Sequence, residues 1–162
     1  MIRDATAGDL AAMLAIYNHA VVHTTASYDY TPRSPENQQV WWNVKQAARY
    51  PVLVSEVDGM VAGFASYGAF RAWDGYRFTV EHSVYVDERF RRRGIASALV
   101  EALLQRAHGA GMHLVVGAID AANAGSIALH RKLGFEEAGV LKEAGYKFER
   151  WLDLAFMSRR LT

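Results

Sequence analysis

The segment HSVYVDERFRRRGIA, residues 82–96, decides the fold of this 162-residue chain. It overlaps the stretch from Phe78 to Val86, which is rich in β-branched and aromatic residues and therefore typical of a strand. A short basic loop follows, and Gly94 then precedes the amphipathic helical pattern of Ile95–His108. A helix start offers unpaired N–H groups and the positive end of a dipole. The segment therefore predicts a pyrophosphate cradle that opens a helix.

The loop itself fits an anion-binding pattern. Arg91-x-x-Gly94-x-Ala96 matches Gln/Arg-x-x-Gly-x-Gly/Ala, in which small residues let the backbone approach a ligand closely. Arg92 and Arg93 would add positive charge. Two other phosphate-loop patterns, G-x-x-x-x-G-K-[ST] and G-x-G-x-x-G, are absent. Taken alone, the loop also fits a solvated turn that carries surface arginines, so a second motif is needed.

The rest of the chain divides into strand and helix patterns on both sides of this segment. Early hairpin signals followed by helical crossovers predict a mixed α/β sheet with helices on both faces, in the order β-α-α-β-β-β-α-β-α-β-β. We expect a single domain over residues 1–162. The expected elements are a helix from Ala7 with a Thr6–Asp9 capping box, a helix opened by Ser34-Pro35-Glu36 that ends before Pro51, a hairpin of Val52–Val57 and Met60–Ala65 around Asp58-Gly59, a strand His113–Ile119, a helix Ser126–Leu133 stopped by Gly134, and strands Phe135–Leu141 and Phe148–Met157.

Composition excludes several classes of protein. Apolar residues make up 51% and there is no cysteine, so disulfides, thiolate catalysis and cysteine-ligated zinc are excluded. No HExxH pattern or paired histidine spacing indicates a metal site. The start of the chain lacks a secretory pattern, and no apolar run approaches the roughly 20 residues of a membrane span. We therefore expect a cytoplasmic protein with no membrane partner.

The arginines of residues 89–93 raise a nucleic-acid patch as an alternative. However, the 18 Lys and Arg residues are balanced by 17 Asp and Glu, for a formal net charge of +1. No interleaved aromatic platform follows the arginines. Phosphate recognition explains them more economically, and no nucleic-acid partner is expected.

A second motif, downstream of the basic loop, decides between these two interpretations of the loop. Residues 123–135, NAGSIALHRKLGF, resemble the N-x-x-[SA]-x-x-L-Y-x-K-x-G-F signature of the GNAT N-acetyltransferases. Both motifs occur in that family's order, with a strand-sized segment between them. The phrases at 16–21, 79–86 and 145–153 further resemble the phosphinothricin and methionine sulfoximine N-acetyltransferases. The resemblance implies the GNAT fold, acetyl-CoA as acetyl donor, a small-molecule amine as acceptor and a homodimer.

The resemblance also implies how acetyl-CoA is held. The strand at Val84–Val86 would splay from its neighbour and present backbone groups to pantetheine, with one N–H facing the thioester oxygen. The pyrophosphate would lie over Arg92–Ser97, with Asn123 beside the pantetheine arm. The expected cofactor-binding residues are Val84, Tyr85, Val86, Arg91, Arg92, Arg93, Gly94, Ile95, Ala96, Ser97, Asn123 and Lys132.

Catalysis is expected by direct attack of the amine, since no cysteine is available for a covalent route. An α-amine has a pKa of roughly 8 and must lose a proton, for which Glu81 is the candidate base, directly or through water. The alternative is a surface glutamate at a strand edge. His130 occupies the place of a family tyrosine that protonates the CoA thiolate, or else is an exposed helix histidine. His82 suits proton shuttling, but also fits a packed core residue.

The acceptor is expected to be bound by the loop that precedes the central strand. Arg71 would grip an α-carboxylate, Trp73 would wall a side-chain pocket, and Tyr28 would close over the substrate. An ordinary surface loop is the alternative, and Trp41, Trp42 and Trp151 are assigned to packing. The expected substrate-binding residues are Tyr28, Arg71, Ala72, Trp73, Glu81, His82 and Ser83.

The acceptors expected from the resemblance are methionine sulfoximine, methionine sulfone and phosphinothricin. A polyamine or a protein N-terminus remains an alternative acceptor. A non-catalytic acetyl-CoA-binding module on the same fold is a further alternative.

Overall fold

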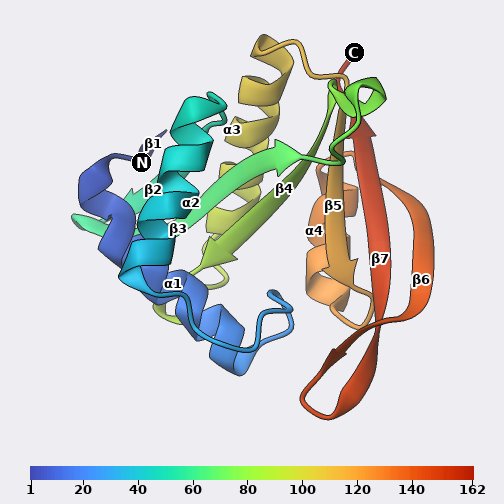
Figure 1. The fold of residues 1–162 in the computed structure, drawn as a ribbon, viewed down its shortest axis with the longest axis horizontal. Coiled ribbons are helices and arrows are strands. Elements are labelled where there is room, and N and C mark those ends of the chain that lie inside the picture. The colour runs from blue at the N-terminus through green and yellow to red at the C-terminus, as the bar shows by residue number, and fades with distance from the viewer.

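The computed structural model describes residues 1–162 as a seven-stranded mixed sheet with four α-helices (Figure 1). The strand order is β1-β2-β3-β4-β5-β7-β6, which confirms the predicted element order and fold class. The strands are β1 (Ile2–Asp4), β2 (Val52–Val57), β3 (Met60–Ala69), β4 (Thr79–Val86), β5 (Leu114–Asp120), β6 (Glu136–Lys147) and β7 (Arg150–Arg160). The helices are α1 (Leu10–His23), α2 (Pro35–Ala47), α3 (Ile95–Gly109) and α4 (Ala124–Lys132), with short 3-10 turns η1 (Ala7–Asp9), η2 (Asp74–Tyr76) and η3 (Glu88–Phe90).

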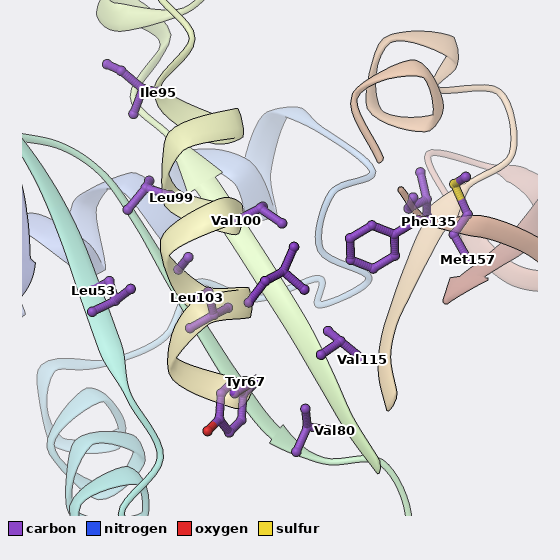
Figure 2. Packing of buried hydrophobic residues seen from close by; sticks show 14 of the residues in the cluster. Leu53, Tyr67, Val80, Ile95, Leu99, Val100, Leu103, Val115, Phe135 and Met157 are labelled. Carbon is purple, nitrogen blue, oxygen red and sulfur yellow. The ribbon is translucent and has the colours of Figure 1, made fainter. Parts of the chain in front are cut away.

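The larger core lies between the sheet and α3. Leu99, Val100 and Leu103 recur at helical spacing and point toward the strands, as Figure 2 shows. Val80 of β4 and Val115 of β5 meet them from the sheet. The same cluster extends to Phe135 and Met157 beside α4, so α3 and α4 cover one face.

The smaller core lies on the opposite face, under α1. Met13, Tyr17 and Val21 of this helix pack against Val54 of β2 and Phe64 of β3. Neighbouring β2 residues alternate between the two cores, as a strand buried on both faces requires. Helices on both faces are thus confirmed.

Local capping explains where the helices begin. The hydroxyl of Ser34 accepts a hydrogen bond from the Asn37 N–H at 3.1 Å, and Pro35 occupies the first helical position as predicted. The Asp9 carboxylate accepts from the Thr6 N–H at 2.8 Å, which confirms the capping box. The first turn after Thr6 is a 3-10 turn, so α1 itself begins three residues later than predicted.

A gap opens in the middle of the sheet. β4 and β5 pair in parallel only from Thr79–Leu114 to His82–Gly117. Beyond His82, β4 stays paired to β3 on its other side, while β5 stays paired to β7 as far as Asp120. The two strands therefore diverge, and the backbone groups of Val84–Val86 that face the gap have no strand partner. This is the predicted splay.

The last hairpin differs from the prediction. β6 continues through Lys147 instead of ending at Leu141, and the turn lies at Phe148 and Glu149, whose φ values are 54° and 58°. Neither position is a glycine or an asparagine, the residues expected in such a turn. Extra residues between Leu141 and Gly145 form a bulge within β6.

The end of β6 holds the loop between α1 and α2. The buried ammonium of Lys147 donates to the carbonyl oxygens of Thr24 at 2.8 Å and Ser27 at 2.5 Å. The hydroxyl of Tyr30 donates to the carbonyl of Tyr146. The close approach also requires a glycine, since a Cβ on Gly145 would lie 2.5 Å from the Tyr28 ring. Residues 24–30 are thereby fixed against the hairpin.

This contact makes Gly145→Ala a sensitive substitution. The new methyl group would collide with the Tyr28 ring, so we expect a loss of about 1–3 kcal/mol in the free energy of unfolding, measured by chemical denaturation. Gly139→Ala is the matched control, because it lies in the same strand with nothing within 4 Å of its Cβ, and should change stability by about 0.5 kcal/mol or less. Equal effects of the two substitutions would contradict the packing described.

Candidate active site

A cavity of about 240 Å³ occupies the gap between β4 and β5. The diverging strands leave an opening through the sheet, so segments from both faces of the sheet line the cavity. The loop after α1 lines one side, and the start and last turn of α4 line the other. Its walls are Thr25, Ala26, Tyr28, His82, Ser83, Val84, Tyr85, Gly117, Ala118, Ile119, Asp120, Asn123, Ser126, His130 and Leu154.

The β4 residues of the cavity contribute mainly their backbone. The Tyr85 side chain is turned away and packs edge-on against Tyr17, with ring centroids 5.3 Å apart. Val84 and Tyr85 line the cavity, as predicted, whereas Val86 lines a separate hollow beside η3. Unpaired backbone N–H groups in a partly dry gap are suited to hold a carbonyl oxygen that becomes negative.

Two buried histidines, His82 of β4 and His130 of α4, lie in contact at the cavity wall. His130 is 3% exposed and His82 is 8% exposed, and their Nε2 atoms are 3.0 Å apart. The Nδ1 atom of His130 is 2.7 Å from the Ser126 carbonyl oxygen. Burial lowers the pKa of His82 to about 3, aided by repulsion from His130, and burial also lowers the pKa of His130. His130 is therefore not the exposed helix residue of the alternative interpretation.

The loop side of the cavity carries Tyr28. Its hydroxyl is buried and has no hydrogen-bond partner within the protein. Burial raises the pKa of Tyr28, so the group stays a neutral donor near pH 7. Thr25 beside it donates to Asp120 at 2.6 Å and ties the loop to the end of β5.

Sequence reasoning missed several residues of this site. Thr25, Gly117, Asp120 and Ser126 all line the cavity. Two signals were available, because Asp120 is a carboxylate directly after a buried strand and Ser126 occupies the [SA] position of the second motif. Thr25 and Gly117 are brought to the cavity by tertiary contacts alone.

The predicted pyrophosphate cradle lies at the start of α3. Gly94 caps the helix with φ 74°, in the left-handed region that favours glycine. The Ile95 side chain is buried in the core, so only its backbone N–H, with those of Ala96 and Ser97, faces outward. Arg91, Arg92 and Arg93 are exposed, and none forms an ion pair with a carboxylate.

The α4 residues predicted to bind cofactor lie at its two ends. The Asn123 side-chain oxygen accepts from the Ser126 N–H at 3.1 Å and caps the helix, which leaves its amide NH₂ free. Asn123 lines the cavity, whereas the exposed Lys132 lies at the other end of α4 and does not.

Glu81 lies beside the cavity and is not part of its wall. It is half-buried on the face of β4 opposite the His82 side chain, and is paired with Gly68 and Val116 on the neighbouring strands. Burial raises the pKa of the Glu81 carboxyl, and the positive charge of Arg71 opposes this rise. A half-buried carboxyl with a raised pKa has the character of a general base.

A second hollow adjoins Glu81 on the other side. This groove of about 450 Å³ carries Arg71 at its margin and is otherwise mostly apolar. Val116, the register partner of Glu81, forms part of its floor. Ala72 and Trp73 are exposed in the same loop and line neither hollow, with Trp73 71% exposed. The groove residues are Phe70, Arg71, Leu114, Val116, Ala138, Gly139, Val140, Leu141, Phe156 and Ser158.

Apart from Ala72 and Trp73, the predicted catalytic and substrate-binding residues thus fall into three neighbouring places. Tyr28, His82, Ser83 and His130 meet at the cavity, Arg71 lies at the groove, and Glu81 is between them. No group of three or more His, Cys, Asp or Glu side chains is placed to hold a metal ion. None of the helices has the length and apolar character of a membrane span.

The arrangement is suited to acyl transfer through the sheet. Backbone donors line the gap, a histidine lies on one side, and a carboxyl of raised pKa lies toward the other face. An anion cradle at the start of α3 is ready for a phosphorylated carrier.

Comparison with known proteins agrees with this chemistry. The model of the acetyltransferase (GNAT) family matches residues 13–135. The L-methionine sulfoximine/L-methionine sulfone acetyltransferase of Pseudomonas aeruginosa is 49% identical over 161 residues, which are 99% of this chain and 94% of the relative.

Two solved structures are similar over nearly their whole length. A GNAT superfamily phosphinothricin acetyltransferase from Sinorhizobium meliloti in complex with AcCoA has a TM-score of 0.97 and 40% identity, covering 99% of this chain and 88% of that chain. A ribosomal-protein-alanine N-acetyltransferase from Brucella melitensis has a TM-score of 0.98 and 47% identity, covering 99% of each. By sequence, by fold and by the geometry of its site, this chain belongs to the GNAT acetyltransferase family.

Proposed function

We propose that this protein transfers the acetyl group of acetyl-CoA to the α-amine of an L-amino-acid analogue such as methionine sulfoximine, methionine sulfone or phosphinothricin. The observation that carries the proposal is the position of Glu81, between the cavity at the strand gap and the groove beside Arg71. The cavity serves the acetyl donor and meets the acceptor at Tyr28, and the groove serves a small acid with an apolar side chain.

The donor enters from the side of α3 and α4. The pyrophosphate is held by the N–H groups of Ile95, Ala96 and Ser97, with positive charge from the exposed arginines around Arg92. The pantetheine arm runs along Val84–Val86, with the free amide of Asn123 beside it. Lys132 at the end of α4 is the remaining cofactor contact that we propose.

The acceptor enters from the side of Glu81. Arg71 binds the α-carboxylate as a bidentate partner. Ala72 and Trp73 line neither hollow, so any contact they make with the acceptor requires the loop to move toward it. The unpartnered hydroxyl of Tyr28 donates to an oxygen of the substrate side chain, which a sulfone, sulfoximine or phosphinate supplies. Ser83 lies between the two partners.

The reaction is a direct attack on the thioester. Glu81 takes the proton from the ammonium group, directly or through water, and the neutral amine forms a bond to the acetyl carbon. The carbonyl oxygen gains negative charge opposite the free N–H groups of β4. The C–S bond then breaks, its electron pair stays on sulfur, and His130 stabilises the departing thiolate.

A protein N-terminus is the second candidate acceptor, because one similar solved structure is that of a ribosomal-protein-alanine N-acetyltransferase. An alanine N-terminus carries the same α-amine but no free carboxylate for Arg71. The role of Arg71 therefore separates the two acceptors.

We predict saturable release of CoA thiol with methionine sulfoximine or methionine sulfone, measured against ordinary amino acids, spermidine and an alanine peptide. Arg71→Ala should raise the KM for the amino-acid analogue by at least about tenfold, because a charge-assisted contact contributes about 1.5–3 kcal/mol. Arg77→Ala, in the same loop but outside both hollows, is the control and should leave the KM unchanged. Turnover only with the peptide would support a protein N-terminus as the acceptor. Tight binding of CoA without turnover of any amine would support the non-catalytic acetyl-CoA-binding module.

The pH dependence tests Glu81. A base must be deprotonated, so kcat should rise with pH through a pKa above the ordinary glutamate value of about 4.3. Arg71 lowers the pKa of Glu81, so Arg71→Ala should move this acid limb to higher pH. Glu81→Gln should abolish the limb and lower kcat by about 10²–10⁴-fold. A wild-type limb that persists in Glu81→Gln would exclude Glu81 as the base.

We also propose that the enzyme is a cytoplasmic homodimer built from one domain of this kind. Exposed apolar residues on the last hairpin support self-association, among them Trp151 at 64% and Leu141 at 53% exposed. Sedimentation should give twice the protomer mass of 18.0 kDa, and Trp151→Glu should shift the protein toward the monomer. A wild-type monomer at micromolar concentration would contradict the dimer.

A further inference from the structure

We propose that His82 is a positioning residue that locks His130 as a neutral imidazole with its proton on Nδ1, so that His130 stabilises the CoA thiolate as a hydrogen-bond donor and not as a proton-donating imidazolium. This inference deepens the proposed function and rests on it for the identity of the leaving group. It assigns His82 to His130 instead of to the substrate.

The hydrogen bonds of His130 determine where its proton lies. A carbonyl oxygen only accepts, so the Nδ1 atom that lies 2.7 Å from the Ser126 carbonyl must carry a hydrogen. In a neutral ring, Nε2 then has only a lone pair. The Nε2 atom of His82, 3.0 Å away, must therefore be the donor in the contact between the two rings.

The surroundings of His82 agree with this assignment. Its Nδ1 atom is buried and has no hydrogen-bond partner, so a proton there would be an unsatisfied buried donor. Placing the proton on Nε2 avoids that cost and supplies the donor that His130 requires. Both ends of the contact thus select one tautomer for each ring.

Packing around the two rings fixes their relative position. They stack with centroids 5.0 Å apart, and Phe135 packs edge-on against His130 at the same distance. Gly117 of β5 provides the space, since a Cβ there would come within 3.0 Å of His82 Nε2 and 3.4 Å of His130. The pair lies at the last paired residues of β4 and β5, where the gap begins.

The pair is built to stay neutral. A second proton on His130 would need His82 to accept at Nε2, which forces the His82 proton onto the partnerless Nδ1. No carboxylate forms an ion pair with either ring, and the other titratable groups on the cavity wall, Asp120, Tyr28 and Tyr85, have no hydrogen bond to them. Glu81 lies on the opposite face of β4. Burial lowers the pKa of both histidines, in agreement with this arrangement.

The consequence for the reaction is specific. When the C–S bond breaks, the thiolate shares the Nδ1–H of His130 with the Ser126 carbonyl oxygen, which already accepts it at 2.7 Å. Ser126 and His130 both line the cavity. The proton lost by the amine goes to Glu81 or water, and the thiolate is protonated by solvent after release. His130 begins and ends the cycle with the same proton.

Nuclear magnetic resonance of protein with ¹⁵N-labelled histidine tests the tautomers without any turnover. We expect His130 to show a protonated Nδ1 and an unprotonated Nε2, unchanged between about pH 5 and 8, the range in which an ordinary histidine changes charge. An imidazolium form, or a proton on Nε2 of His130, in this range would overturn the proposal. Because acetyl transfer plays no part, this outcome is independent of the acceptor assignment.

Two variants test the role of His82. His82→Gln keeps an N–H donor near the position of Nε2, whereas His82→Leu removes it. We expect His82→Leu to free Nε2 of His130 for a proton, so that the pKa of His130 rises from its lowered value, a new ionisation enters the kcat profile and kcat falls at least about tenfold.

We expect His82→Gln to restore the pH-independent resonances of His130 and most of kcat, with the KM for acetyl-CoA unchanged in both variants. Equal loss in the two variants without any change in His130 titration would show that His82 acts through packing alone, which contradicts the proposal. If neither variant folds, the resonances of the wild-type protein still decide it.

Discussion

The parallel pairing of β4 and β5 ends at His82 and Gly117, and the rest of the site depends on that ending. Each strand keeps its other partner, so the divergence costs only the hydrogen bonds across the gap. Those freed backbone groups become the donors of the site. The sheet is thus both the scaffold and the catalytic surface, and the cavity passes between its strands.

The two faces of the sheet separate the two partners of the reaction. α3 and α4 cover one face and provide the phosphate cradle, the Asn123 cap and His130. The other face carries Glu81, with the groove of Arg71 beside it. Since a strand alternates its side chains, Glu81 and His82 face opposite ways although they are neighbours in sequence. The base that we propose, Glu81, therefore lies on the face of β4 opposite His82, which contacts the proposed thiolate-stabilising residue His130.

The last hairpin has a structural role beyond the sheet. Lys147 and Gly145 fix residues 24–30, and through them the unpartnered hydroxyl of Tyr28 at the cavity wall. Burial of a lysine is costly, and here two carbonyl oxygens compensate it. This part of the cavity wall is therefore set by a residue more than a hundred positions away in sequence, which no local pattern indicates.

The sequence by itself determined the element order, the helix caps and the cradle at Gly94, because periodicity, capping and glycine conformation are local properties. It misplaced the turn of the last hairpin, since Phe148 and Glu149 adopt positive φ values without the glycine or asparagine that indicates such a turn, and a bulge before Gly145 interrupts the strand. Only the tertiary structure decided that His82 contacts His130, that Glu81 lies outside the cavity, and that Arg71 belongs to a second hollow. Those relations depend on which strands diverge and by how much, and neighbouring residues alone do not specify a divergence between strands about thirty residues apart.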